Sequence, residues 1–289
     1  MTLSTVDRAE LALLLEVSAA PKPGNADRER DLPDLHFEQF LAGAVGARDG
    51  LEAAAGDGRL GAAFETAVAG MADAAGTNTQ FGCLLLLVPL VRTAATGDLT
   101  PDRADEVVGG TTVEDAADFY RAFEHTDVAV GDPPAGMADL DVRRGAAAVP
   151  AVRERSVTLY DVLAASADRD GNAAQWASGF EDVFETAGRI REGDGPLTDR
   201  AARAFLDRLA AEPDTLVRTE HGEAVAEEVR RRAADLRGAD EVAVREFAAE
   251  LVERGVNPGT TADHVCAALY VALERGASVR ARPGTGASR

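Results

Sequence analysis

Apolar residues recur along most of the chain with the spacing of an α-helix. The run Phe37, Phe40, Leu41, Ala44 and Val45 has this spacing, which places all five side chains on one helix face. Runs of strand length that alternate apolar and polar residues are scarce, and β-branched and aromatic residues are few. The pattern therefore predicts an all-α fold. Helices are expected near residues 4–19, 36–56, 60–75, 78–96, 101–108, 112–125, 158–168, 171–192, 198–211, 220–237, 241–254 and 258–275.

Three stretches interrupt the helical pattern because they are rich in Pro, Gly or charge. They cover residues 20–35, 127–156 and 277–289. The middle stretch is long enough for a lid or binding loop, and a plain linker between two helical halves is an equal alternative. Since apolar helices are predicted on both sides of it, we expect a single compact multi-helix domain of about ten to twelve helices over residues 1–276. Residues 277–289 are expected to form a flexible C-terminal tail.

The composition is strongly acidic. The 289 residues include 50 Asp and Glu against 30 Lys and Arg, so the net charge is −20, and Lys22 is the single lysine. An acidic surface with almost no lysine is typical of a protein that works in concentrated salt, so we expect a halophilic microbe as the source. No basic stripe is present that could displace phosphate counterions, which argues against a nucleic-acid partner.

No membrane segment or export signal is evident. The longest apolar run, Cys83 to Val91, is about half the roughly 20 residues that span a bilayer. The N-terminus lacks a basic region followed by an apolar one, so it does not read as a signal peptide. The two cysteines, Cys83 and Cys266, cannot form a disulfide framework or a four-ligand zinc site. We therefore expect a cytoplasmic protein with no membrane partner.

Removal of salt is expected to loosen or unfold the protein. The carboxylates repel one another more strongly when the Debye length grows from about 3 Å in molar salt to about 30 Å at 0.01 M. The thermal midpoint, measured over a series of salt concentrations, should fall in dilute buffer. A midpoint that desalting leaves unchanged would count against a halophilic origin.

The stretch Pro21–Arg28 is the first candidate for chemistry. Its two prolines stiffen the backbone, and Gly24 permits a positive φ or a close approach of the backbone to a ligand. It carries Lys22, Asp27 and Arg28. Because lysine is missing everywhere else, Lys22 points to a task for a compact ammonium group, such as phosphate binding or acid–base work. The alternative is a chance survivor in a solvated loop.

The segment Gly76–Gly82 places small polar residues at the start of a very apolar helix. The free N–H groups and the positive dipole of a helix N-terminus can hold phosphate. An ordinary N-cap at Thr77 or Asn78 explains the same residues, and it is the stronger reading of this segment alone.

Two later segments carry further candidates. Glu212–Gly222 contains Asp214 and His221. Gly255–His264 opens a helix and contains Asp263, which could simply complement the helix dipole. A lone histidine is more often structural than catalytic, and the histidine spacing is not that of a zinc site.

Together these segments resemble the triphosphoribosyl-dephospho-CoA synthase family. The resemblance lies in Glu16-Val17-Ser18 with Pro21–Arg28, in Gly76–Gly82, in Asp214-Thr215 with His221-Gly222, and in Asn257, Gly259, Ala262 and Asp263. The family has a His where this chain has Gln80. The stretch Ser156–Phe180 is more similar to the archaeal branch. The resemblance runs from about residue 10 to residue 275 and implies an all-α fold, in agreement with the periodicity.

The resemblance implies a transferase reaction. In the family, the 2′-hydroxyl of 3′-dephospho-CoA attacks C1″ of the ATP ribose, adenine leaves and the triphosphate is kept. Such a glycosyl transfer passes through an oxocarbenium-like transition state, so it needs a carboxylate near the anomeric carbon and a base for the hydroxyl. The triphosphate needs Mg²⁺, basic side chains and helix N-termini to balance its charge.

The resemblance also implies a set of site residues. Asp27, Asp214 and Asp263 are expected to be catalytic and to serve as Mg²⁺ ligands. Substrate and phosphate binding is expected from Lys22, Gly24, Asn25, Arg28, Asn78, Thr79, Gln80, His221, Asn257 and Gly259. We expect these residues to converge on one pocket. If the family His acts as an acid or base, Gln80 cannot replace it, because an amide does not titrate.

ATP and dephospho-CoA are thus the expected small-molecule partners, and a homodimer is left open. One alternative is a related nucleotide-dependent transferase that takes a different acceptor, such as another nucleotide or a pterin-like compound. Another is a non-catalytic helical nucleotide-binding protein that kept the pocket and lost the reaction. Adenine release from ATP with a candidate acceptor distinguishes these alternatives.

Overall fold

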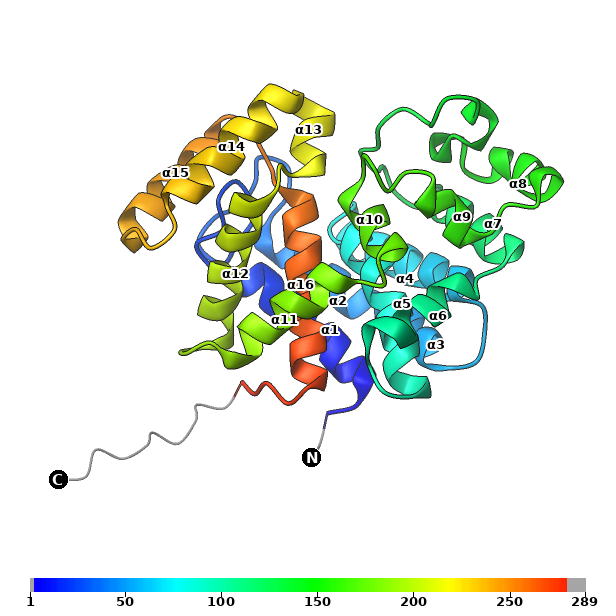
Figure 1. Ribbon diagram of the computed structural model, residues 1–289, viewed down its shortest axis with the longest axis horizontal. Coiled ribbons are helices and arrows are strands. Elements are labelled where there is room, and N and C mark those ends of the chain that lie inside the picture. Colours follow the sequence, from blue (N-terminus) through cyan, green and yellow to red (C-terminus); the bar gives the residue numbers. More distant parts are fainter. Residues whose placement is uncertain (1–2, 280–289) are drawn as a thin grey trace.

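A computed structural model describes residues 3–279, and helices make up most of them (Figure 1). These residues contain sixteen α-helices, two short 3-10 helices and no β-strand. The elements are α1 (Thr5–Ser18), α2 (Phe37–Gly46), α3 (Arg48–Ala55), α4 (Leu60–Ala75), α5 (Phe81–Thr96), α6 (Pro101–Gly109), α7 (Val113–Ala122), η1 (Ala138–Leu140), η2 (Val142–Ala148), α8 (Val149–Arg155), α9 (Leu159–Ala164), α10 (Gly171–Ala177), α11 (Glu181–Glu192), α12 (Leu197–Ala211), α13 (Thr215–His221), α14 (Glu223–Asp235), α15 (Glu241–Glu253) and α16 (Gly259–Glu274).

The all-α prediction is confirmed, but the expected number of ten to twelve helices is too low. Two expected helices are each divided in two, the first at Ala47 between α2 and α3. The second division lies between α10 and α11, where Gly179 and Phe180 both have φ of +64°. A left-handed Phe is unfavourable by itself, and here its side chain is fully buried while its N–H donates to the Gln175 carbonyl at 2.8 Å.

Two further helices are not evident from periodicity. Helix α8 lies within residues 127–156, and it packs with η2 against α7. This segment is therefore part of the fold and not a plain linker between two halves. Helix α13 is a short helix that Asp214 caps, with its carboxylate accepting bonds from Leu216 N–H and Val217 N–H.

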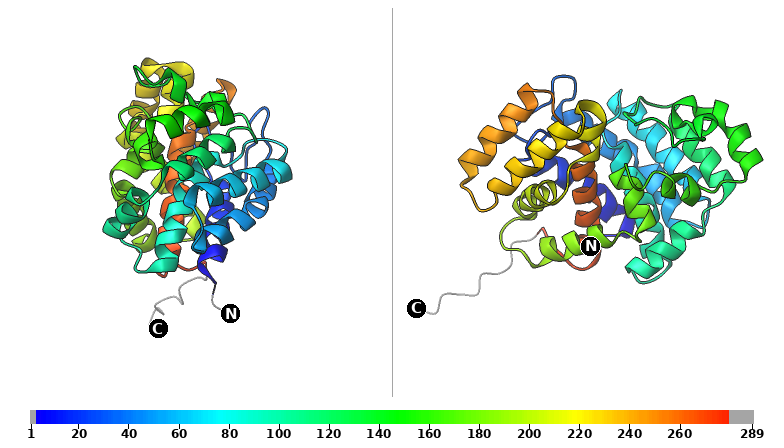
Figure 2. Two further views of the ribbon diagram at one scale, coloured as in Figure 1. Left: turned by 90° about the vertical axis from the view of Figure 1, so that its right-hand side faces the viewer. Right: turned by 45° about the horizontal axis from the view of Figure 1, so that its top comes forward.

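Helix α16 occupies the middle of the molecule in all three ribbon views (Figures 1 and 2). Thirteen of its sixteen residues are buried, and it packs against α1, α5, α11 and α12. Its last turns are tied to the start of the chain, because Tyr270 and Thr5 share a hydrogen bond and Arg8 pairs with Glu274. One hydrophobic cluster extends from Val6 to Leu273. The expected tail at 277–289 falls mostly outside the described residues.

Helices α2 and α3 pack unusually close to α4, and glycine makes this contact fit. A Cβ added to Gly70 would lie 2.1 Å from the Gly46 carbonyl oxygen, and one added to Gly46 would lie 2.2 Å from the Gly70 carbonyl oxygen. Both obstacles are main-chain atoms, which cannot rotate away. Helices α2 and α4 would therefore have to separate to admit even a methyl group.

The substitution Gly70→Ala is therefore expected to destabilise the fold by about 1–3 kcal/mol through overpacking. Gly188→Ala is the matched control, because Gly188 lies within α11 and a Cβ there would meet nothing within 4 Å. The control should stabilise the protein by about 0.5–1 kcal/mol through helix propensity. Denaturant unfolding measures both changes, and equal effects of the two substitutions would contradict the close packing.

Helix α5 is the most continuously apolar element, and eleven of its sixteen residues are buried. No single helix of residues 3–279 is long and apolar enough to cross a membrane; α5 and α6 reach that length and composition only as a pair bent by 110°.

Candidate active site

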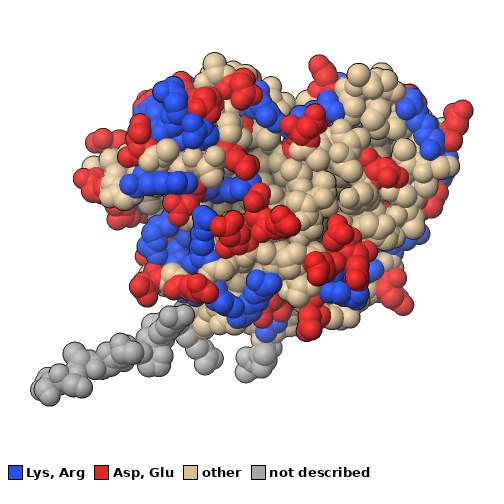
Figure 3. Space-filling view, in the orientation of Figure 1, with Lys and Arg blue, Asp and Glu red and all other residues tan. Residues whose placement is uncertain are grey.

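A cavity of about 610 Å³ lies between two groups of helices. One wall comes from α7, α9, α10 and the segment 127–142, and the other comes from α13 and the loop before α16. In Figure 3 the surface is hollowed between these two groups, at the top of the view. Within the described chain, eight acidic side chains line the cavity, compared with only two arginines. Its interior is therefore acidic, like the protein as a whole.

Asp263 is the carboxylate best placed for chemistry. It lies near the N-terminal end of α16 and lines the cavity. Asn172 Nδ2 donates to its Oδ2 at 2.8 Å, and the Cys83 thiol donates to its Oδ1 at 3.2 Å. Burial raises the pKa of Asp263 to about 7, with nearby Glu16 adding to the rise and the two hydrogen bonds opposing it. This carboxyl can take up or release a proton near neutral pH.

The neighbouring helix makes room for this carboxylate. A Cβ added to Gly82 on α5 would lie 1.9 Å from Asp263 Oδ2. Gly82 therefore lets α5 approach the Asp263 carboxylate closely. Gly82 also lines the cavity.

Lys22 is fully buried and does not line the cavity. Its ammonium group pairs with Glu16 and donates a second bond to Asn25 Oδ1 at 2.8 Å. Burial raises the pKa of Glu16, and the attraction of Lys22 opposes that rise. Glu16 and Asn25 do line the cavity. Lys22 thus supports two lining side chains from behind.

The loop 20–35 is joined to the loop that precedes α16. Asn25 Nδ2 donates to Asn257 Oδ1 at 2.8 Å, and both amides line the cavity. Gly24 has φ of +76°, and a Cβ there would lie 2.3 Å from the Val256 carbonyl oxygen. Gly24 therefore serves the close approach of two loops, which places Asn25 beside Asn257.

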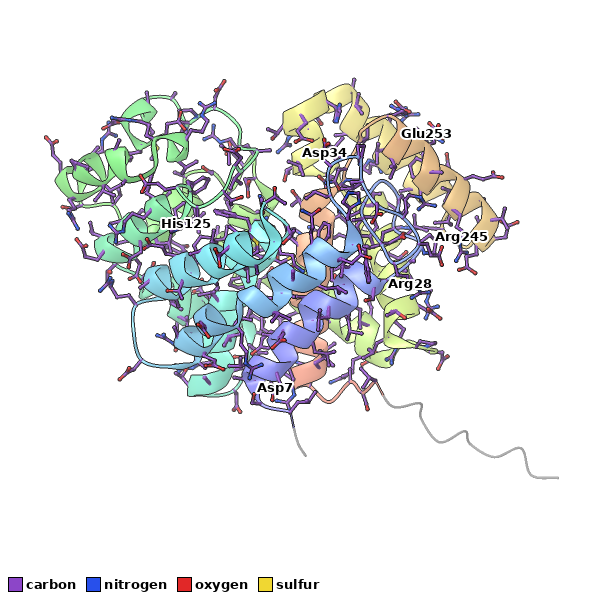
Figure 4. All side chains as sticks on the ribbon, turned by 180° about the vertical axis from the view of Figure 1, so that it is seen from behind. Asp7, Arg28, Asp34, His125, Arg245 and Glu253 are labelled. Carbon is purple, nitrogen blue, oxygen red and sulfur yellow. The ribbon has the colours of Figure 1, made fainter. Side chains whose placement is uncertain are left out.

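Asp27 and Arg28 do not reach the cavity lining. Asp27 is fully buried, and its carboxylate accepts bonds from Lys22 N–H at 3.0 Å and Glu29 N–H at 2.9 Å. Arg28 is exposed and donates to the Ser18 carbonyl. Figure 4 shows Arg28 at the same edge of the molecule as Arg245. These two predicted site residues shape the loop and do not contribute to the cavity.

Asp214 and His221 also lie outside the lining. The second oxygen of Asp214 accepts bonds from the amide and the hydroxyl of Thr261, both at 2.7 Å, so Asp214 fastens α13 to α16. Burial raises its pKa. His221 Nε2 lies 3.1 Å from the Gly255 carbonyl oxygen. Next to them, Thr215 and Gly259 do line the cavity.

The Gly76–Gly82 segment is divided between the cavity and the core. Asn78 and Thr79 line the cavity, and the Thr79 hydroxyl has no partner within the described chain. Gln80 is buried away from it, with its N–H₂ group 3.5 Å from the Leu13 carbonyl oxygen. The residue that differs from the family pattern thus lies behind the cavity.

Many lining residues are absent from the set predicted from the sequence, and three charged examples are Arg169, Arg218 and Asp170. Arg169 and Arg218 are the two basic side chains of the lining, and Arg218 donates to the Arg169 carbonyl at 2.6 Å. Asp170 caps α10 and lines the cavity, and burial raises its pKa against the opposing effect of its main-chain hydrogen bonds. Nothing in the sequence distinguishes these arginines from the others. Asp170 is equally inconspicuous among fifty acidic residues.

The three aspartates expected to bind Mg²⁺ do not form a joint site. Asp27 and Asp214 are engaged by main-chain amides, and Asp263 alone of the three faces the cavity. Over residues 3–279, no group of three or more His, Cys, Asp or Glu side chains is arranged to hold a metal ion. Within these described residues no closed magnesium site is present, and a metal brought by substrate phosphates would need at most one or two of the cavity carboxylates.

The described residues thus form an all-helical domain whose cavity is lined by Asp263, a carboxylate with a pKa raised to about 7. The sequence profile of the ATP:dephospho-CoA triphosphoribosyl transferase family matches residues 3–281. Since this match covers nearly the whole chain, the protein belongs to that family and is a transferase.

A solved structure supports the fold. A protein of Archaeoglobus fulgidus, described as a triphosphoribosyl-dephospho-CoA synthase, superimposes with a TM-score of 0.68 at 23% identity. The similarity covers 83% of this chain and 100% of that one. No curated protein sequence matches the chain.

Proposed function

We propose that the protein transfers the triphosphoribosyl part of ATP to the 2′-hydroxyl of 3′-dephospho-CoA in this cavity, with release of adenine. The family supplies the reaction, and the observation that carries the assignment to the cavity is Asp263. A carboxyl with a pKa of about 7 is matched to proton transfer at neutral pH.

Asp263 is the general base of this proposal. It accepts the proton of the 2′-hydroxyl while the oxygen of that hydroxyl forms a bond to C1″ of the ATP ribose. The bond from C1″ to the adenine nitrogen breaks, and its electron pair leaves with adenine, which then takes a proton from solvent. Asn172 and Cys83 hold the carboxylate in place for this step.

Glu16 has a complementary role. An oxocarbenium-like ribose carries positive charge, which a nearby carboxylate stabilises. Glu16 lines the cavity close enough to Asp263 to influence its pKa. Lys22, buried behind it, favours the ionised form of Glu16 and fixes its direction.

Arg169 and Arg218 are proposed to bind the triphosphate. They are the two cationic side chains in the described lining, and the Nε of Arg169 has no hydrogen bond there, only a 3.6 Å ion pair with Asp168. Two arginines leave most of the charge of a triphosphate unbalanced, which is why Mg²⁺ remains part of the proposal. The metal would enter with ATP and supply charge neutralisation.

The direct test is a mass-spectrometric search for the product of ATP and 3′-dephospho-CoA at high salt, together with release of adenine. Product and adenine in equal amounts support the proposal. Adenine that appears only with another nucleotide or a pterin-like acceptor would support the alternative transferase. No adenine with any acceptor would favour a protein that binds nucleotide without reaction.

A further inference from the structure

The segment between α7 and η1 forms an apolar wall of the cavity. It is the loop coloured green above α9 in Figure 1. Val128, Val130, Pro133, Pro134 and Met137 line the cavity from this segment, and all five are only partly buried. Val128 and Met137 also pack against the hydrophobic core, and the apolar surface that the five residues leave uncovered faces the cavity. We call these five residues the apolar wall.

Helical side chains extend the same apolar surface. Phe123, which follows α7, and Val162 and Leu163 of α9 also line the cavity. The arginines, amides and carboxylates given roles above come from other elements, namely α1, α5, α10, α13, α16 and the loops beside them. The segment 127–142 itself adds three further lining carboxylates, Asp127, Asp132 and Asp141, which would repel phosphate but not an uncharged chain. The cavity is thus chemically divided. One part is suited to phosphates and a reacting ribose, and the other is suited to an uncharged chain.

The two substrates of the proposed reaction differ in whether they contain a long uncharged chain. ATP consists of phosphates, ribose and a flat base. The acceptor adds a long pantetheine arm, which has methyl and methylene groups, two amides and a terminal thiol but no charge. Covering exposed apolar side chains with such an arm is favourable by roughly 25 cal/mol per Å² of apolar surface.

We infer that the apolar wall binds the pantetheine arm of the acceptor and so determines which nucleotides the protein accepts as acceptors. This inference rests on the proposed function. The arm would lie along the wall, while the acceptor ribose reaches Asp263. Asn78 is held against the same segment by a bond from its Nδ2 to the Asp127 carbonyl at 3.2 Å, which keeps the wall at the cavity edge.

The test compares two identical substitutions. Val128→Asp puts a charge into the apolar wall, whereas Val242→Asp puts the same charge on α15, where Val242 is 64% exposed and lies outside the cavity lining. We expect Val128→Asp to raise the KM for dephospho-CoA about tenfold or more and to leave the KM for ATP unchanged. Val242→Asp should change neither. Free pantetheine should compete with dephospho-CoA and not with ATP.

The outcomes separate this inference from the proposed function. An equal rise of both KM values, or no change in either, would overturn the inference while the reaction stands. If the wild-type protein does not turn over this substrate pair, calorimetric titration with pantetheine tests whether the apolar wall binds the arm. Binding that Val128→Asp weakens supports the wall, and absence of binding overturns it. Val128→Thr, which has nearly the same shape, replaces the Asp variant in these measurements if that variant fails to fold.

Discussion

Replacing Asp263 by Asn is expected to lower kcat/KM for adenine release by about 10²–10⁴-fold, the range in which a general base contributes. The amide keeps the size of the side chain but cannot accept the hydroxyl proton. Initial rates of adenine formation measure the effect. Asp73→Asn is the matched control, because Asp73 is exposed on α4 and outside the cavity lining, and it should leave the rate unchanged.

The dependence on pH gives the same prediction a second measurement. As a base, Asp263 is active when ionised, so kcat/KM of the wild type should rise with pH through about 7 and then level off. Residual activity of the Asn variant should lack this rise. A wild-type rate that falls through pH 7 would instead make the group an acid, and equal rates in wild type and variant would remove Asp263 from the mechanism.

The same substitution should stabilise the fold. The pKa of Asp263 is raised in the folded state from an ordinary value of 3.8, so the folded form binds the proton more tightly and loses stability as pH rises from about 4 to about 7. Asn at this position has no ionised form, so it does not lose stability as the pH rises. Because the side chain is partly open to water in the cavity, we expect a gain on the order of 2 kcal/mol at pH 8 and none below pH 4. Denaturant unfolding at these pH values measures the difference.

Replacing Lys22 by Met is expected to destabilise the protein by about 3–5 kcal/mol at neutral pH, because it leaves the buried Glu16 without its partner. Lys22→Arg should also destabilise, since a guanidinium group is larger than the fully enclosed space that the ammonium occupies. Denaturant unfolding gives the size of the loss. Arg28→Met removes a positive charge from the exposed part of the same loop and should cost less than 1 kcal/mol.

A double variant isolates the cause. When Glu16→Gln is combined with Lys22→Met, both charges of the pair are gone, and most of the lost stability should return. A double variant as unstable as Lys22→Met alone would show that packing around Lys22 matters and its charge does not. Neither variant should retain full activity, because Glu16 lines the cavity.

Periodicity alone was enough to predict the fold class, since helix after helix buries one apolar face. The division between α10 and α11 was not predictable, because it depends on the left-handed conformation of Phe180, whose buried side chain is stabilised by tertiary packing. Helix α13 was missed for a related reason. It is seven residues long, too short for a periodic signal, and Asp214 anchors it through Thr261, 47 positions away.

The site shows what local sequence can and cannot say. Asp27, Asp214 and Asp263 are alike as residues, and only their partners differ: main-chain amides for the first two, and Asn172 and Cys83 for the third. The partners of Asp27 are close in the sequence, whereas those of Asp263 lie 91 and 180 positions away. Composition draws attention to Lys22, but its burial behind Glu16 is a tertiary fact that the sequence does not show. Arg169 and Arg218 carry no signal, because arginine is the general basic residue of this chain.

The burial of Lys22 has a consequence for chemical labelling. Its ammonium group is the single side-chain amine of the whole sequence, and it is fully enclosed. In the folded protein an amine-directed reagent therefore finds no exposed lysine in this sequence. Modification of Lys22 requires the loop 20–35 to open, so the rate of modification would report the free energy of that local opening. No mutation is needed for this measurement. Labelling of Lys22 would therefore measure how often the loop 20–35 opens to solvent.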